Sequence, residues 1–254
     1  MRAMTLVLLS AMLLSTLAAS GQTTPTLGFA ELSATTKAIR TFKPKDEFDS
    51  PPKQPSLADR SFSVTVAPLK RGPDNKICDG FPSWGYFVND GHYEVGANAG
   101  MSLARDLRPR SGLGFPEGEG SLGAFVYFAS FGCERVGDSY YEAKNALGAA
   151  TRVHRIYDVV LAFSDREAGM TRNGWSTAIT GDAARQLSQA VRIRITGTLK
   201  DWSTGQSVIC ALDRRTPTFQ LPMDRTLDIC VFRTQALHFE VVDSRTGEVL
   251  SSGN

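Results

Sequence analysis

Short segments in which apolar and polar residues alternate recur along much of this chain, and this period of two constrains its fold more than any other feature. Residues 61–66 read Ser-Phe-Ser-Val-Thr-Val, and residues 191–196 read Val-Arg-Ile-Arg-Ile-Thr. Such alternation predicts strands with one buried face and one face in solvent. Further candidate strands lie at 84–88, 92–95, 122–131, 140–144 and 151–163.

Turn signals separate several of these segments. Asn89-Asp90-Gly91 stands between two candidate strands, and Asp-Gly supplies the positive φ angles of a tight hairpin. The pattern D-x-x-T-G occurs at 201–205 and again at 243–247. An Asp that caps a turn with its side chain, followed by a Gly in the left-handed region, is typical of a type I turn with a glycine bulge. We therefore expect turns at all three places.

Only one segment has a clear helical period. Residues 182–190 place Ala183, Leu187 and Ala190 on one side of a short helix. The connection at 145–148 is either a turn or a second short helix. The helical content of the chain is therefore expected to be small.

The many strand candidates and the single good helix predict a mainly β protein. Residues 61–254 are expected to form a single β-rich domain, either an antiparallel β-sandwich or a barrel-like structure, with one or two short helices. An α+β arrangement is the alternative. The sequence does not choose between sandwich and barrel.

Residues 21–60 differ in composition from the rest of the chain. They hold five prolines among Ser, Thr, Lys and Asp, and they show little apolar periodicity. This composition predicts a Pro/Ser/Thr-rich linker or loosely packed arm, because a segment with little buriable surface cannot offset its ordering entropy. A short helix or strand within 27–42, docked on the body, remains open.

The first twenty residues have the layout of a secretory signal peptide. Arg2 precedes an apolar run, and Ala18-Ala19-Ser20 offers the small residues that a signal peptidase prefers. The run is shorter than the roughly 20 residues that a membrane-spanning helix usually needs. An uncleaved membrane anchor is the alternative. We expect cleavage of residues 1–20 and a periplasmic or secreted protein with no membrane span after cleavage.

The four cysteines fit that address: Cys78, Cys133, Cys210 and Cys230. An even number of cysteines in an oxidising compartment indicates disulfides, whereas zinc and thioredoxin-like sites favour a C-x-x-C spacing that the chain lacks. Three pairings are possible. We favour Cys210 with Cys230 and Cys78 with Cys133, because each then closes a local loop. A loop of about 20 residues stabilises a fold by roughly 3 kcal/mol in the chain-entropy model.

The overall charge gives no support for two classes of partner, nucleic acid and anionic membranes. The chain has 28 basic and 26 acidic residues, a formal net charge of +2. Binding to nucleic acid or to an anionic membrane needs clustered Lys and Arg. This balance gives no electrostatic case for either, and we expect no nucleic-acid partner.

Three histidines are available for a metal or general-base role: His92, His154 and His238. They do not cluster in the sequence, and the common nucleophile and zinc-protease motifs do not occur. We expect no metal and no cofactor. The alternative function is an extracytoplasmic hydrolase or metal-dependent enzyme that uses His92 or His238.

Aromatic residues provide the remaining hint about function. Trp84 and Tyr86 share one face of a candidate strand, and His92 flanks the hairpin that follows. An exposed pair of this kind recognises peptides, sugars or lipid headgroups, whereas packing in the core is the alternative. These three residues are the candidate ligand-binding site. We expect an exported, non-catalytic binding or envelope-associated protein whose partner is an unknown protein, glycan or small-molecule ligand.

Overall fold

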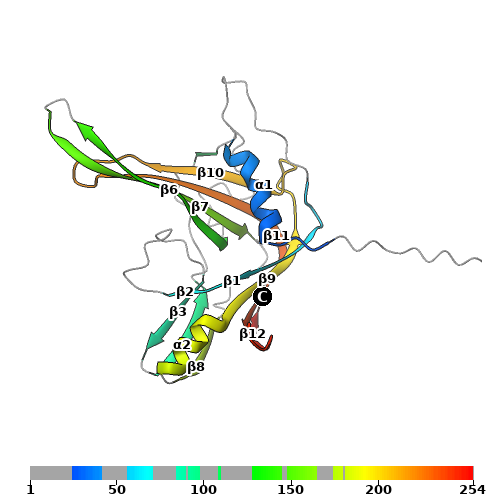
Figure 1. Cartoon of the computed structure of the whole chain (residues 1–254). Coiled ribbons are helices and arrows are strands. Elements are labelled where there is room, and N and C mark those ends of the chain that lie inside the picture. The colour runs from blue at the N-terminus through cyan, green and yellow to red at the C-terminus, as the bar shows by residue number, and fades with distance from the viewer. Residues whose placement is uncertain are drawn as a thin grey trace, which may run out of the picture.

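The computed structural model describes residues 25–41, 56–70, 84–89, 91–97, 108–109, 128–144, 148–164, 174–179 and 181–253. Within these ranges the protein is mainly β, as predicted, with two helices, a large curled sheet and a small second sheet (Figure 1). The predicted signal peptide at 1–20 and the 122–127 part of one candidate strand lie outside them. No helix in the described part of the chain is long and apolar enough to cross a membrane.

The helices are α1 (Phe29–Thr41) and α2 (Gly181–Ala190). The large sheet contains β1 (Ser61–Val66), β5 (Arg108–Pro109), β6 (Phe128–Lys144), β7 (Ala150–Ser164), β9 (Val191–Leu199), β10 (Val208–Arg215), β11 (Met223–Asp243) and β12 (Val249–Gly253). The small sheet contains β2 (Leu69–Lys70), β3 (Trp84–Asn89), β4 (His92–Ala97) and β8 (Gly174–Ala178).

Strand β11 joins the two halves of the large sheet. Its first half, within 223–233, pairs in parallel with β7 and antiparallel with β10. Its second half, within 234–243, pairs antiparallel with β9 and β12. Between the halves the register shifts at Gln235–His238, and Ala236 has a φ of 56°. Such an irregularity bends a strand, so β11 can serve partners that point in different directions.

The first half of β11 belongs to an arm that projects from the body (Figure 1). Four strands lie side by side there in the order β6, β7, β11, β10. The pairs β6–β7 and β11–β10 are antiparallel, as the strand pattern predicts, whereas β7 and β11 are parallel. Parallel partners are joined by long connections, so local sequence patterns do not reveal them.

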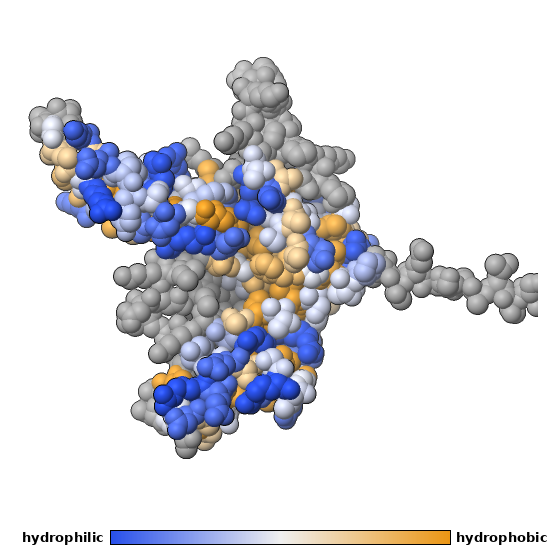
Figure 2. Space-filling model, in the orientation of Figure 1, coloured by the Kyte–Doolittle hydropathy of each residue, from blue (hydrophilic) through white to orange (hydrophobic). Residues whose placement is uncertain are grey.

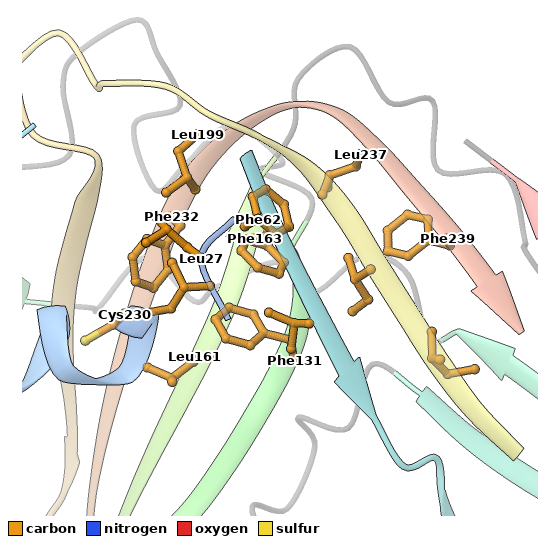
Figure 3. Close-up of a cluster of buried hydrophobic side chains, with 14 of the residues drawn as sticks. Leu27, Phe62, Phe131, Leu161, Phe163, Leu199, Cys230, Phe232, Leu237 and Phe239 are labelled. Carbon is orange, nitrogen blue, oxygen red and sulfur yellow. The ribbon is translucent and has the colours of Figure 1, made fainter. Parts of the chain in front are cut away.

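Stacked aromatic rings form the core beneath α1 (Figure 3). Phe62 of β1 stacks on Phe163 of β7 with ring centroids 4.2 Å apart, and Phe163 stacks on Phe131 of β6 at 4.1 Å. Phe232 of β11 packs against Phe163 at 6.2 Å. All four side chains are buried. The cluster therefore ties β1, β6, β7 and β11 together at the root of the arm.

Helix α1 covers this core with one face. Its buried residues are Leu32, Thr36 and Ile39, which have the spacing of a single helical face. The Gly28 backbone N–H donates to the Glu31 carboxylate at 3.0 Å and so caps the first turn. The helix lies within the segment 21–60, whose composition predicts a linker or arm. Residues 29–41 of this segment form a helix docked on the body, which is the alternative that the sequence allowed within 27–42.

The disulfide predicted between Cys210 and Cys230 is present. The two residues lie directly opposite each other on β10 and β11, with an S–S distance of 2.02 Å. Cys133 on β6 is also disulfide-bonded. Its predicted partner, Cys78, lies outside the described residues.

The predicted turns and the predicted helix are largely confirmed. β3 and β4 pair as a hairpin with Asn89 opposite His92, and Gly91 has a φ of 79°; Asp90 lies outside the described residues. Gly205 and Gly247 also have positive φ angles. The predicted helix appears as α2, although it buries Ala184 rather than Ala183. β6 and β7 form a hairpin around the segment 145–148, of which 145–147 lie outside the described residues.

Candidate interaction site at the end of the arm

The register of the arm strands decides which side chains meet. Tyr140 on β6 lies opposite His154 on β7, and His154 pairs with Met223 on β11. Because side chains alternate along a strand and cross-strand partners share a face, these residues lie on one face of the arm. We call it the His154 face. Tyr141 lies on the other face, which we call the Tyr141 face.

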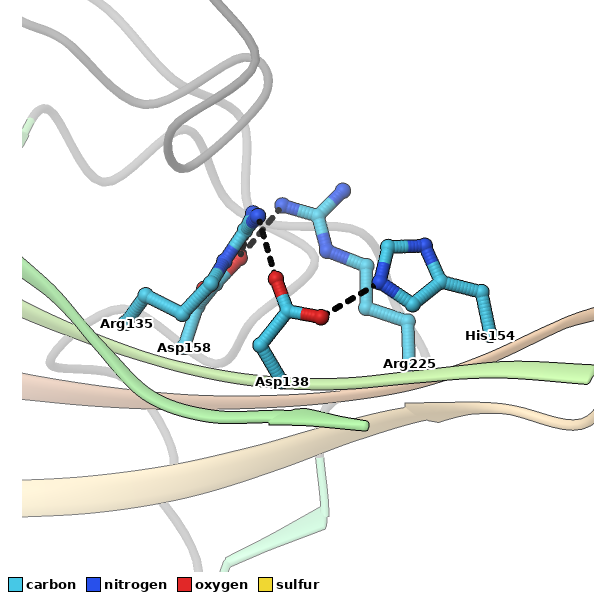
Figure 4. Close-up of polar contacts among 5 residues, drawn as sticks. All are labelled: Arg135, Asp138, His154, Asp158 and Arg225. Atoms are coloured by element: carbon cyan, nitrogen blue, oxygen red, sulfur yellow. Dashed lines mark hydrogen bonds and ion pairs between the residues drawn. The ribbon is translucent and has the colours of Figure 1, made fainter. Parts of the chain in front are cut away.

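A buried carboxylate anchors the His154 face (Figure 4). Asp158 is fully buried, and the Arg135 guanidinium donates to it from Nε at 2.9 Å and from a terminal nitrogen at 3.4 Å. Arg225 on β11 donates to the same carboxylate at 3.5 Å. The hydrogen bond to Asp158 raises the pKa of Arg135 above its usual value. One charge on β7 thus ties together β6, β7 and β11, and its two arginine partners offset the cost of its burial.

Asp138 links this cluster to His154. Its carboxylate contacts Arg135 at 3.4 Å and His154 Nε2 at 2.7 Å. The hydrogen bond from His154 lowers the pKa of Asp138, with a further contribution from Arg135. Asp138 is therefore ionised at neutral pH, and Nε2 carries the proton that it donates. The imidazole ring is held in one orientation on the strand.

The Tyr140 ring stacks on His154 and also contacts Arg152. The rings of Tyr140 and His154 have centroids 4.4 Å apart and planes only 7° apart. The Arg152 guanidinium carbon lies 4.4 Å from the centroid of the same tyrosine ring. Tyr140 is nevertheless 54% exposed. The face thus presents an aromatic and cationic platform to solvent on a rigid base.

The Tyr141 face is braced by a second set of charges. Arg155 lies over the Tyr141 ring at 4.4 Å and donates to Asp224 on β11 at 3.2 Å. The Tyr141 hydroxyl donates to the same carboxylate at 3.4 Å, and Arg214 on β10 lies 4.0 Å from it. Asp224 is itself buried. Both faces of the arm therefore hold their strands together with charged groups, far from the aromatic core.

The loop 216–222 between β10 and β11 completes the site. Its exposed apolar residues are Phe219 at 58% and Leu221 at 57%. Thr218 N–H donates to the Leu221 carbonyl at 2.9 Å, and the loop is fastened to β7 because His154 N–H donates to the Pro222 carbonyl at 2.9 Å. The loop is therefore a closed turn whose two apolar side chains remain in solvent.

We define the arm end as residues 138–144, 150–155 and 214–223. It carries five basic side chains, Lys144, Arg152, Arg155, Arg214 and Arg215, and two acidic ones, Asp138 and Glu142, while Asp213 and the buried Asp224 directly flank the range 214–223. All five basic residues are exposed. Hydrophilic residues cover most of the arm on the face seen in Figure 2. The arm end therefore combines a basic surface with three exposed apolar or aromatic side chains.

The sequence-based ligand site lies elsewhere, on the small sheet. Tyr86 is half-buried and stacks on the buried Tyr93 with centroids 5.3 Å apart, so its ring contributes to packing. His92 and Glu94 are exposed on one face of β4. The Trp84 side chain is outside the described atoms. A role for Trp84, Tyr86 and His92 in binding stays a prediction.

The structure does not bring the three histidines together. His92 lies on β4 of the small sheet, and His238 Nε2 lies 3.8 Å from Glu240 on the second half of β11. His154 pairs with Met223, which is separated from His238 by roughly 50 Å of extended strand at ~3.3 Å per residue. Among the described residues, no group of three His, Cys, Asp or Glu side chains could hold a metal ion.

Sequence reasoning missed the arm end because its residues meet through non-local pairing. Tyr140 and His154 each fall in a predicted strand, but their contact depends on the β6–β7 register. One local signal was available: Phe219 and Leu221 lie between Pro217 and Pro222 in a segment without strand alternation. Large apolar residues in a proline-bounded loop indicate exposed side chains, since loops run over the surface. The chain matches no known protein-family model, no curated protein and no solved structure.

Proposed function

We propose that this protein is an exported, non-catalytic binding protein that engages its partner with the arm end. One observation carries the proposal. Tyr140, Phe219 and Leu221 are each more than half exposed, and they gather on strands and a loop that hydrogen bonds hold in place. Aromatic and large apolar side chains that remain exposed on a preorganised surface favour recognition, because little ordering entropy is lost on binding.

The chemistry of the arm end supports binding rather than catalysis. His154 Nε2 is engaged with Asp138, and the ring lies flat against Tyr140. Asp158 and Asp224 are each held by basic partners. These groups are arranged to hold one another in position. The arm end therefore supplies a shaped surface with charge and stacking, which are the features of an interaction site.

Two features support the exported address. The apolar run before Gly21, with Arg2 ahead of it, has the layout of a cleaved signal. The Cys210–Cys230 disulfide is compatible with an oxidising compartment. Intact-mass measurement of protein purified from an export-competent bacterium tests this part. Loss of about twenty residues together with two disulfides supports it. An unprocessed or fully reduced chain would contradict it.

Site-specific photo-crosslinking tests the binding part in living cells. A photoreactive residue is placed at Phe219, and matched controls carry it at Val88 on the small sheet or Val249 on β12, which are exposed at 51% and 46%. Adducts of any chemical class are then identified by mass spectrometry. The proposal expects adducts at position 219 and background at 88 and 249. Equal yields at all three positions would refute binding through the arm end.

A further inference from the structure

We infer that the partner of the arm end is the surface of an anionic lipid bilayer, on which the loop 216–222 inserts its apolar side chains. The inference rests on the proposed function and names the partner of that site. Three observations carry it. Phe219 and Leu221 are exposed on the loop that joins β10 and β11. Basic residues lie on the strands next to this loop, and hydrogen bonds hold the loop in place.

The position of the apolar residues suits a planar partner. Phe219 and Leu221 lie on the loop between β10 and β11, and Figure 1 shows these strands in the arm that projects from the body. Phe and Leu favour the boundary between headgroups and acyl chains, and an exposed tyrosine such as Tyr140 favours the interface itself.

The basic residues lie where phosphate headgroups would meet the arm. Arg214 and Arg215 end β10 and directly precede the loop, and Arg152 stands near the start of β7 on the His154 face. Arg155 is on the Tyr141 face, where it binds the buried Asp224 through Nε and keeps 56% of its side chain exposed. A guanidinium binds phosphate through paired hydrogen bonds. The chain as a whole is nearly neutral, and folding produces the cluster that its composition does not reveal.

Charge and chemistry disfavour other occupants. Two copies meeting arm to arm would bring the exposed Arg152, Arg214 and Arg215 of one copy against the same residues of the other, which is repulsive. A glycan would use the aromatic rings and the arginines of the arm end, but its polar surface would leave the exposed aliphatic side chain of Leu221 without an apolar partner. A lipid surface uses both the apolar and the basic groups.

The test is co-flotation of the mature, oxidised protein with vesicles. One set contains phosphatidylglycerol and phosphatidylcholine, and the other contains phosphatidylcholine alone. The inference expects flotation with the first set only, reduced at high salt. The double variant Phe219→Ser/Leu221→Ser should reduce vesicle binding by about tenfold or more. Arg214→Gln/Arg215→Gln should also weaken it and reduce its salt dependence.

Matched controls separate lipid binding from loss of fold. Val88→Ser and Val249→Ser remove exposed apolar side chains elsewhere and should float like the parent protein. The variants at Phe219, Leu221, Val88 and Val249 should retain the parent melting temperature, because these side chains are exposed. For Arg214→Gln/Arg215→Gln the melting temperature is measured alongside flotation, because Arg214 lies near the buried Asp224. Failure of the parent protein to bind phosphatidylglycerol vesicles, or equal binding by the Phe219→Ser/Leu221→Ser variant, would overturn the inference.

The outcome is distinguishable from failure of the proposed function. A protein adduct at position 219 in cells, with no vesicle binding, would overturn the lipid inference and leave binding through the arm end intact. Absence of adducts at position 219 together with absence of vesicle binding would overturn both. A lipid adduct at 219 with selective flotation supports both.

Discussion

Tyr140 and His154 lie directly opposite each other on β6 and β7, with their rings stacked 7° from parallel. Asp138 holds the edge of the imidazole, and Arg152 lies over the tyrosine. An exposed aromatic ring normally moves freely, whereas this one is held by its contacts with His154 and Arg152. The stack therefore supplies a rigid platform next to the apolar loop.

Removal of the Tyr140 ring should weaken binding without unfolding the protein. Tyr140→Ala deletes the stacked surface, whereas Tyr140→Phe keeps it and serves as the matched control. Because the residue is more than half exposed, we expect Tyr140→Ala to change the free energy of unfolding by less than about 1 kcal/mol. The yield of adducts from a photoreactive residue at 219 should fall for the Ala variant only. Equal yields from both variants would remove Tyr140 from the site.

Loss of one arginine partner of Asp158 should destabilise the arm. Arg225→Met leaves the buried carboxylate with Arg135, and we expect a loss of about 1–3 kcal/mol in the free energy of unfolding. Urea denaturation measures it. The control is Arg185→Met, which removes an exposed pair with Asp182 on α2 and should change stability by less than about 0.5 kcal/mol. A similar small change in both variants would show that Arg225 does not stabilise the buried Asp158 carboxylate.

Asp243 should give the protein a stability contribution that is lost in acid. The pKa of Asp243 is lowered to about 2, below the usual 3.8, mainly because the Arg245 side chain donates a hydrogen bond to its carboxylate. A lowered pKa in the folded state stabilises the protein above about pH 4, and this contribution disappears as the pH falls toward 2.

Arg245→Met should raise that pKa toward its ordinary value. The stability difference between the parent and Arg245→Met, measured by urea denaturation, should shrink between pH 5 and pH 2. Asp243→Asn is the control. It has no carboxyl at position 243, so its stability should lack the contribution that disappears between pH 5 and pH 2. A difference that stays constant down to pH 2 would show that the hydrogen bonds of Arg245 do not set the pKa.

Helix α1 should behave as part of the folded body. Leu32→Ala opens a cavity where the helix meets the aromatic core, and we expect a loss of about 2–5 kcal/mol in the free energy of unfolding. Lys37→Ala on the exposed side of the same helix should have little effect. If both substitutions were neutral, residues 29–41 would act as a loosely attached segment, as the composition of 21–60 predicts.

Local patterns predicted the elements of this fold whose causes are local. The alternation at 61–66 and 191–196 appears as β1 and β9, and the Asp-Gly signal after Asn89 marks the β3–β4 hairpin. The disulfide between Cys210 and Cys230 could also be predicted from the sequence, because only 20 positions separate the two cysteines. Each of these features depends on residues that are close in sequence.

Long-range pairing accounts for what the sequence did not reveal. β11 changes its pairing partners near Ala236. The sequence of β11 does not indicate that its second half pairs with β9 and β12. Burial of α1 depends on a core built from β1, β6, β7 and β11. The arm end depends on the β6–β7 register and on the parallel neighbour β11. Sequence alternation therefore favours the aromatic residues at 84 and 86 over Tyr140, whose exposure follows only from the folded arm.

Hydrogen–deuterium exchange tests most directly where the protein binds. Exchange is compared between the purified protein alone and the same protein mixed with the envelope fraction of its native host. The account predicts slower exchange in 150–155 and 214–223, with no change in α2 at 181–190. Slower exchange confined to the small sheet at 91–97, or unchanged exchange in both 150–155 and 214–223, would contradict binding through the arm end.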